Sequence, residues 1–245
     1  MSSACPNPRP VFGAWTSSPT WVRAVPFAAF IVLTFLQGKL GDASRYWLYF
    51  VKTVAGAGMI WAVRPFVSEL RWKLSWEAAA VGVGVFVMWV GLDPYYPTLD
   101  GLAAKLGVGK ANPAAEQAAA MWNPHAQFGA GSAWAWFFIL VRILGSSLVV
   151  PPLEEVFYRS FLYRYVTRPD FTSVPLGAFA WLPFLLTSVL FGLAHNEWLA
   201  GILCGFAFQG LVSRKKRLDD AIAAHAITNF LLGLWVVSRG AWKYW

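Results

Sequence analysis

Charged residues are scarce in this 245-residue chain: Asp, Glu, Lys and Arg together make up 13% of it, and only 12 residues are acidic. A soluble globular domain carries about 25% charged residues. The apolar fraction of 58% and the 15 tryptophans point the same way, because aromatic rings gather where a membrane meets water. The composition excludes an ordinary soluble domain and predicts a single integral membrane domain, residues 1–245.

Cysteine is nearly absent as well. Cys5 lies in a polar segment and Cys204 in an apolar run, so the sequence excludes a disulfide framework and any cysteine-based zinc site. The first residues lack a charged segment followed by an apolar core, so we expect no cleavable signal peptide. The first apolar run is expected to act as the insertion signal itself.

Negative charge is the scarcer sign, and the net charge is +8. Such an excess is also found in nucleic-acid-binding proteins, but here the basic residues flank apolar runs, where they set membrane topology. We therefore predict a membrane partner and no nucleic acid. With the N-terminus inside, the inner flanks hold Arg9, Arg23, Arg64, Arg71, Lys73, Arg164, Arg168, Arg214, Lys215, Lys216 and Arg217. The outer flanks hold Lys39, Arg45, Lys105, Lys110, Arg239 and Lys243. This excess predicts a cytoplasmic N-terminus, in what we expect to be a bacterial cytoplasmic membrane.

Long apolar runs are what the chain does have, and a bilayer-spanning helix needs about 20 such residues. The sequence predicts an all-α, polytopic transmembrane bundle of about seven to eight helices. They are expected near residues 21–36, 46–63, 77–92, 132–150, 152–166, 176–195, 198–212 and 221–238. Residues 93–131 are more polar and read as a connecting loop with short helices near 99–106 and 113–122. Lys52, near a helix end, is expected to snorkel toward water.

Pro151 and Pro152 separate two of these runs. Each proline lacks an N–H and crowds the preceding turn, so we expect a kink or break there. Pro152 would then begin a new helix, with Glu154 near the positive end of its dipole.

Three polar pairs interrupt the apolar second half, between residues 151 and 238, and each pair is spaced by four residues. They are Glu155 with Arg159, preceded by Glu154; Phe191 with His195; and His225 with Asn229. Four residues is about one helical turn, so each pair shares a helix face. Ionisable groups at membrane depth are costly, which makes these residues functional candidates.

The first pair predicts a division of labour between adjacent carboxylates. Arg159 follows Glu155 in the favourable order for a helical ion pair, so Glu155 should be neutralised. Glu154 has no local cation, and in an apolar, partly wet cavity it is suited to act as a general base. A purely structural link between Glu155 and Arg159 remains an open alternative.

The other pairs supply imidazoles and an amide. His195 ends its helix and can reach an aqueous interface, and Phe191 on the same face is expected to pack in the core. His225 and Asn229 share a face, and paired donors suit a developing oxyanion. No HExxH and no GxSxG occur, so water is the natural nucleophile. A Glu/His/His metal site stays geometrically possible, although we predict neither a metal nor another cofactor.

In their order and spacing, Glu-Glu-x-x-x-Arg, Phe-x-x-x-His and His-x-x-x-Asn, these residues resemble the CPBP family of intramembrane glutamic endopeptidases. That family includes the type II CAAX prenyl endopeptidases and their bacterial relatives. The resemblance implies a helical membrane protease acting on a membrane-associated protein or peptide, lipidated or C-terminally sorted. It also implies Glu154 and His195 on the catalytic water, His225 and Asn229 as the oxyanion hole, and Glu155 and Arg159 as support. The sequence Asn196-Glu197-Trp198 resembles the branch found beside bacterial exosortase systems.

Two other classes of function remain open from the sequence. One is a membrane haem protein with His195 and His225 as axial ligands, which would leave Glu154, Glu155 and Asn229 without a role. The other is a catalytically silent binding or maturation partner, in which the polar pairs only hold helices together.

Overall fold

The computed structural model describes residues 17–108 and 121–245, and within these ranges the regular secondary structure is helical, with no strand. The predicted all-α class is confirmed. The first half holds α1 (Pro19–Phe35), α2 (Ser44–Val63) and α3 (Trp76–Leu92), close to the expected bounds. Ser18 and Ser75 cap α1 and α3 by accepting hydrogen bonds from backbone N–H groups of their first turns.

The polar region after α3 contains two short helices in its described parts. They are α4 (Leu99–Lys105), which matches the helix expected near 99–106, and α6 (Pro124–Phe128), which the sequence analysis did not predict. The helix expected near 113–122 falls almost wholly outside the described residues. Short 3-10 turns occur at η2 (Arg64–Phe66), η3 (Asp93–Tyr95), η6 (Phe171–Ser173) and η7 (Trp242–Tyr244).

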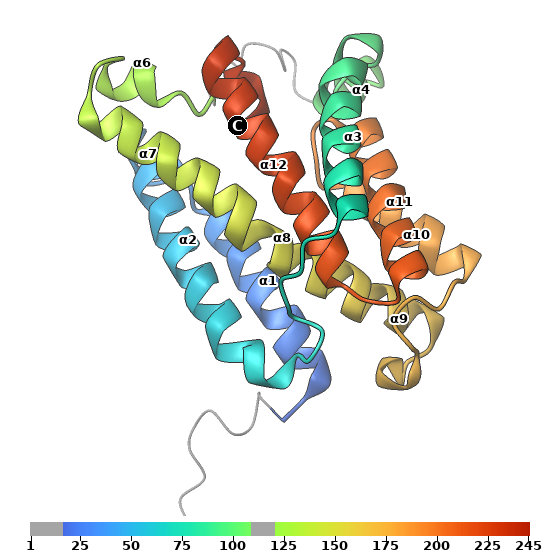
Figure 1. Ribbon diagram of the computed structural model, residues 1–245. Coiled ribbons are helices and arrows are strands. Elements are labelled where there is room, and N and C mark those ends of the chain that lie inside the picture. The colour runs from blue at the N-terminus through green and yellow to red at the C-terminus, as the bar shows by residue number, and fades with distance from the viewer. Residues whose placement is uncertain (1–16, 109–120) are drawn as a thin grey trace, which may run out of the picture.

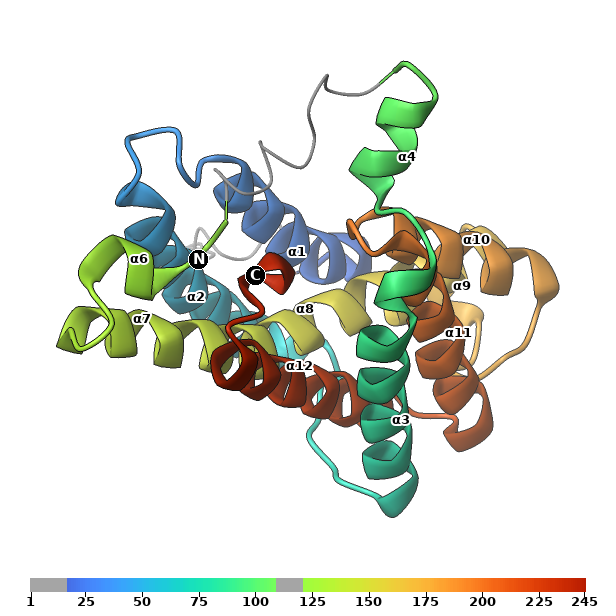
Figure 2. The same cartoon turned by 90° about the horizontal axis from the view of Figure 1, so that it is seen from above.

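One continuous helix runs from Ala133 to Thr167 through the centre of the bundle (Figure 2). Its segments are α7 (Ala133–Leu144), η4 (Gly145–Val149), α8 (Val150–Glu155), η5 (Val156–Leu162) and α9 (Tyr163–Thr167), of which η4 and η5 are π-helical. The break expected at Pro151 and Pro152 is therefore wrong, and Glu154 lies inside a long helix rather than at a helix start.

The π turn of η4 explains how the helix passes two prolines. The N–H of Val150 donates to the carbonyl of Gly145, five residues back, so this turn is wider than an α turn. A wider turn relieves the crowding that a proline ring imposes on the preceding carbonyls. It also leaves the Ser146 carbonyl without a helical donor, since Val150 bonds elsewhere and Pro151 has no N–H.

The second half continues with α10 (Trp181–Leu193), α11 (Trp198–Lys215) and α12 (Asp219–Arg239). Glycines let these helices approach closely. A side-chain carbon on Gly192 would lie 2.3 Å from Ile202, and one on Gly82 would lie 2.6 Å from the carbonyl of Ala224. Small residues at such crossings are the usual device for packing helices in membranes. They set α10 against α11, and α3 against α12.

Among the described residues, three helices are long and apolar enough to cross a membrane: Trp76–Lys105, Ala133–Thr167 and Asp219–Arg239. Shorter apolar helices, α1 and α10 among them, stand beside these in the same bundle (Figure 1). Large apolar side chains face outward, for example Trp61 at 78% and Trp76 at 75% exposure. Outward apolar surface on such helices is what a lipid environment requires, so the protein is a helical membrane bundle.

The loops gather at two ends of this bundle. One end holds the joins between α2 and α3, α9 and α10, and α11 and α12. The other holds the joins between α1 and α2, and α10 and α11, together with α4, α6 and the C-terminus (Figure 1). We call them the basic end and the opposite end, because the first carries the run Arg214–Arg217.

A buried ionic network closes the basic end. The Arg23 guanidinium lies 2.8 Å from Glu69, whose carboxylate also accepts from Ser160 and lies 3.5 Å from Arg164. Burial alone would raise the pKa of Glu69, but hydrogen bonds from Arg23 and Ser160 outweigh it and lower that pKa to about 2. The network ties α1, the segment before α3 and the long central helix together.

Lys52 departs from expectation. Its side chain is 4% exposed and its ammonium group donates to the Thr34 hydroxyl at 2.9 Å, so it points into the bundle instead of snorkelling to a surface.

Candidate active site

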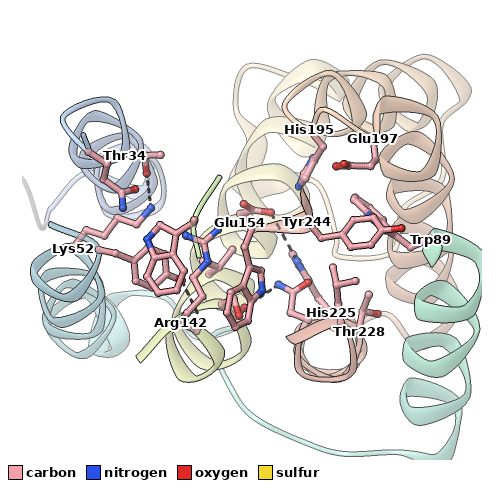
Figure 3. A pocket seen from close by; sticks show the side chains of 18 of the residues that line it. Thr34, Lys52, Trp89, Arg142, Glu154, His195, Glu197, His225, Thr228 and Tyr244 are labelled. Atoms are coloured by element: carbon pink, nitrogen blue, oxygen red, sulfur yellow. Dashed lines mark hydrogen bonds and ion pairs between the residues drawn. The ribbon is translucent and has the colours of Figure 1, made fainter. Parts of the chain in front are cut away.

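Glu154 and the residues of the second and third polar pairs line one cavity of about 470 Å³ (Figure 3). Glu154 reaches it from α8, His195 from just beyond α10, and His225 and Asn229 from α12. Segments that are far apart in sequence thus bring every predicted catalytic side chain to the same space. The wall also includes side chains from α1, α2, α3 and α7, so the cavity extends beyond residues 151–238.

Glu155 is the buried centre of the cluster, with 0% exposure. Its Oε2 lies 3.2 Å from Nε of Arg159, which confirms the predicted ion pair. Its Oε1 lies 2.9 Å from Nδ1 of His225. Arg159 also donates weakly to the Gly205 carbonyl and lies 4.5 Å from the ring of Phe191. Glu155 therefore holds an imidazole as well as a guanidinium, a second contact that the sequence analysis did not find.

The contact with Glu155 sets the hydrogen on His225. A carboxylate only accepts hydrogen bonds, so Nδ1 carries a hydrogen and Nε2 faces the other way. Nε2 lies 4.0 Å from Oε2 of Glu154. His225 is thus placed between the two adjacent glutamates, with Phe208 stacked on its ring at 5.1 Å.

Glu154 lines the cavity with its side chain 15% exposed. Its Oε2 is buried and has no hydrogen-bond partner among the residues that the structure describes. The two glutamates differ in their partners: Glu155 lies in an ion pair with Arg159 and in hydrogen-bond contact with His225, whereas Glu154 contacts neither an arginine nor a lysine among the described residues. An unpaired carboxylate oxygen on a cavity wall is placed to accept a hydrogen bond from water or substrate.

His195 is oriented by its own helix. Its Nδ1 lies 2.8 Å from the Phe191 carbonyl, so Nδ1 is the donor and Nε2 is left as the acceptor. Figure 3 shows the imidazole directed toward the cavity. Phe191, 1% exposed, packs in the core as expected and contacts the rings of both His195 and His225.

Hydrogen bonds with the first residues of α4 and with Pro97 just before it hold the loop that carries His195. Asn196 accepts from the N–H of Leu99 at 2.8 Å through its carbonyl, and from the N–H of Asp100 through its side chain. The indole of Trp198 donates to the Pro97 carbonyl at 3.1 Å. The region read from sequence as a connecting loop therefore helps to position the site.

Asn229 is held by the π turn. Its Nδ2 donates to the Ser146 carbonyl at 2.8 Å, the carbonyl that η4 leaves without a helical donor. One amide hydrogen is used in this contact and the second remains for another acceptor. The hydrogen bond therefore satisfies the Ser146 carbonyl that the π turn leaves free, and it fixes the orientation of the Asn229 amide.

Several residues that line the cavity were not predicted from sequence as site residues. Trp89 lies against His195, and its indole N–H is buried without a partner within the described part of the chain. Thr228 donates to the carbonyls of Gly82 and Ala224. Glu197 is 9% exposed, and its burial raises its pKa above the ordinary range. No spacing pattern marks these residues, because they meet the site only through packing.

The sequence left open a metal site formed by one glutamate and two histidines. In residues 17–108 and 121–245, no group of three or more His, Cys, Asp or Glu side chains is arranged to hold a metal ion. Nδ1 of His225 is engaged by Glu155, and Nδ1 of His195 by the Phe191 carbonyl.

Comparison with known proteins places this region in a family. Residues 132–231 match the family model described as type II CAAX prenyl endopeptidase Rce1-like. The match starts at the N-cap of α7, ends within α12 and includes all three polar pairs. No curated protein and no solved structure matches the chain. The family resemblance seen in the sequence is confirmed for this region, and the exosortase-associated branch stays a prediction.

Proposed function

We propose that the protein is an intramembrane glutamic endopeptidase, because residues 132–231 match the family model described as type II CAAX prenyl endopeptidase Rce1-like. It would hydrolyse a peptide bond of a membrane-associated protein or peptide, lipidated or C-terminally sorted. The observation that carries this proposal is the cavity itself, where an unpaired Glu154 faces a His225 held by a fully buried Glu155.

Glu154 and His195 are proposed to activate the attacking water. Glu154 offers an unpaired oxygen and His195 offers Nε2 as an acceptor, so both can accept a hydrogen from one water. As the water attacks the carbonyl carbon, its proton passes to Glu154. The same carboxylic acid then protonates the departing amine, which leaves the carboxylate free for the next cycle.

The oxyanion formed in this step needs donors, and we assign them to His225 and Asn229. Asn229 keeps one amide hydrogen beyond its bond to Ser146. His225 donates from Nε2 when its ring is the imidazolium, since Nδ1 already donates to Glu155. Glu155 and Arg159 position the ring, and residues 151–238 form the catalytic region.

The orientation of the site follows from the two ends of the bundle. Loop and terminal residues that line the cavity, Gln37, Gly38, Trp122, Glu197 and Tyr244, all belong to the opposite end. With the basic end in the cytoplasm by the positive-inside rule, α1 starts on the inner side. The cavity then opens toward the outer side of a bacterial cytoplasmic membrane.

The decisive experiment compares membrane proteins from cells that express the wild type, Glu154→Gln or Glu77→Gln. Glu77 pairs with Lys215 near the basic end and makes a matched control. Mass spectrometry should find a cleaved product with wild type and Glu77→Gln that is missing with Glu154→Gln. Equal product with Glu154→Gln would instead support a catalytically silent maturation partner.

The haem alternative has a simple test. A red preparation with a Soret band would support His195 and His225 as axial ligands. The structure favours the peptidase, because Nε2 of His225 faces a carboxylate oxygen at 4.0 Å.

A further inference from the structure

The cavity that holds Glu154 has a second, cationic side that the catalytic pairs do not use (Figure 3). Lys52 reaches it from α2 and Arg142 from α7. We propose that Lys52 and Arg142 form an anion-binding subsite for an oxyanion group of the substrate, either a C-terminal carboxylate or a lipid phosphate. The direction of the peptide relative to this subsite rests on the proposed function, whereas the binding itself does not.

Lys52 is a buried cation held in place by groups without charge. Its Nζ donates to the Thr34 hydroxyl at 2.9 Å and lies 4.6 Å and 4.7 Å from the ring centroids of Phe30 and Tyr49. These contacts orient the ammonium group, but they use one of its three hydrogens. The remaining donors are available to a ligand in the cavity.

Arg142 is framed by aromatic rings. Its guanidinium carbon lies 4.4 Å from the ring of Tyr49, 5.0 Å from that of Trp122 and 6.0 Å from that of Trp245. Aromatic faces fix a guanidinium plane while leaving its N–H groups at the edge. Such an edge matches the two oxygens of a carboxylate or phosphate.

Neither cation forms an ion pair with a carboxylate in the part of the chain that the structure describes. Arg23, Arg159 and Arg164 are as buried as Lys52 and all do, whereas Arg142 is partly buried. Burying a charge without a partner is costly, so an unpaired pair of cations in one cavity indicates a partner that arrives from outside. Glu154 lines the same cavity as the two cations but forms no ion pair with either of them.

This arrangement predicts how a substrate lies. With its scissile carbonyl at Glu154 and the oxyanion donors, an anionic group of the same substrate reaches Lys52 and Arg142. A chain end bound there would direct cleavage to a site near the C-terminus. A lipid phosphate bound there would instead select substrates at the membrane interface.

The test measures binding in the Glu154→Gln background, so that no probe is hydrolysed and the result does not depend on the peptidase assignment. One arm compares an N-acetylated apolar tripeptide with a free carboxylate against the same peptide as its amide. The other compares nanodiscs of phosphatidylglycerol with nanodiscs of phosphatidylcholine, read as thermal stabilisation. The full chain is used throughout.

We expect one anionic probe to bind about 10–100-fold more tightly than its neutral or zwitterionic counterpart, the usual worth of hydrogen bonds to charged groups. Lys52→Met and Arg142→Gln should each remove that preference. Arg239→Gln is the matched control, since Arg239 is also stacked on an aromatic ring but is exposed and lies outside the cavity. A preference in the peptide arm identifies a carboxylate as the ligand, and a preference in the lipid arm identifies a phosphate.

Two results would overturn the proposal. One is equal binding of acid and amide together with equal effects of the two lipids, a comparison that needs neither Lys52→Met nor Arg142→Gln to fold. The other is a preference that survives in both Lys52→Met and Arg142→Gln. In the active protein the same variants should raise KM and leave kcat near wild type. A fall in kcat alone would mean that the cations act on Glu154 instead.

Discussion

Replacing Glu155 by glutamine tests the arrangement of the site most directly. The substitution preserves shape and removes one negative charge at a position with 0% exposure. Arg159, itself 3% exposed, then keeps its charge with only the distant Gly205 carbonyl and aromatic faces around it. His225 loses the carboxylate that fixes its ring at 2.9 Å. One change therefore disturbs both partners.

The size of the effect follows from the buried ion pair. Breaking such a pair by removing one member costs roughly 3–5 kcal/mol, because the other charge stays behind without compensation. For a chain of this length each kcal/mol lowers Tm by roughly 2–4 °C. We therefore expect Glu155→Gln to melt about 6–20 °C below wild type. Glu154 forms no ion pair with an arginine or lysine in the part of the chain that the structure describes, so the Tm of Glu154→Gln should stay near wild type while its activity falls to background.

The assay measures Tm in detergent and a cleavage rate for each variant. Arg159→Gln should share the instability of Glu155→Gln, because either change leaves an unpaired buried charge. The double variant Glu155→Gln, Arg159→Gln should recover part of the lost Tm, since removing both charges is far cheaper than removing one. Its cleavage rate should remain low, because His225 is still without a carboxylate partner.

The reverse pattern would refute this reasoning. If Glu154→Gln melts early while Glu155→Gln is stable and inactive, the roles of the two glutamates are exchanged. If the double variant is no more stable than the singles predict by addition, the 3.2 Å contact between Glu155 and Arg159 carries no coupling energy.

Four further predictions follow from other parts of the molecule. Asn229→Ala should lower kcat by about 10²–10³, the usual cost of one oxyanion donor, and wild-type turnover would remove that role. In a cysteine-free background, an impermeant maleimide applied to intact cells should label Tyr244→Cys but not Lys216→Cys; the opposite result would invert the topology. Glu69 has a lowered pKa of about 2, so its stabilisation is complete above its ordinary pKa of 4.5 and is lost as pH falls toward 2; Glu69→Gln should flatten the curve of Tm against pH in that window, because it removes a pH-dependent stabilisation of roughly 3 kcal/mol. A strong chelator should leave peptide cleavage unchanged, and a loss that zinc but not calcium restores would show that a metal activates the water.

Local spacing explains what was predictable from sequence. The pairing of Glu155 with Arg159, the shared faces of the other polar pairs, and the placement of α4 all depend on helical periodicity within a few residues. The membrane class likewise follows from long apolar runs and few charges, which no soluble core needs. These properties belong to short segments, so they do not depend on how the segments pack.

Packing between helices decided the rest. Glu155 and His225 are 70 residues apart, and only the packing of α8 against α12 brings their atoms to 2.9 Å. The π turn at Gly145–Val149 depends on Asn229 from another helix to satisfy the Ser146 carbonyl, so the two prolines alone suggested a break that does not occur. Lys52 lies inside the bundle because its ammonium group donates to the Thr34 hydroxyl there and lies over two aromatic rings. A sequence determines which faces are polar, whereas the tertiary structure determines which faces meet, since that depends on interhelical contacts that no local period encodes.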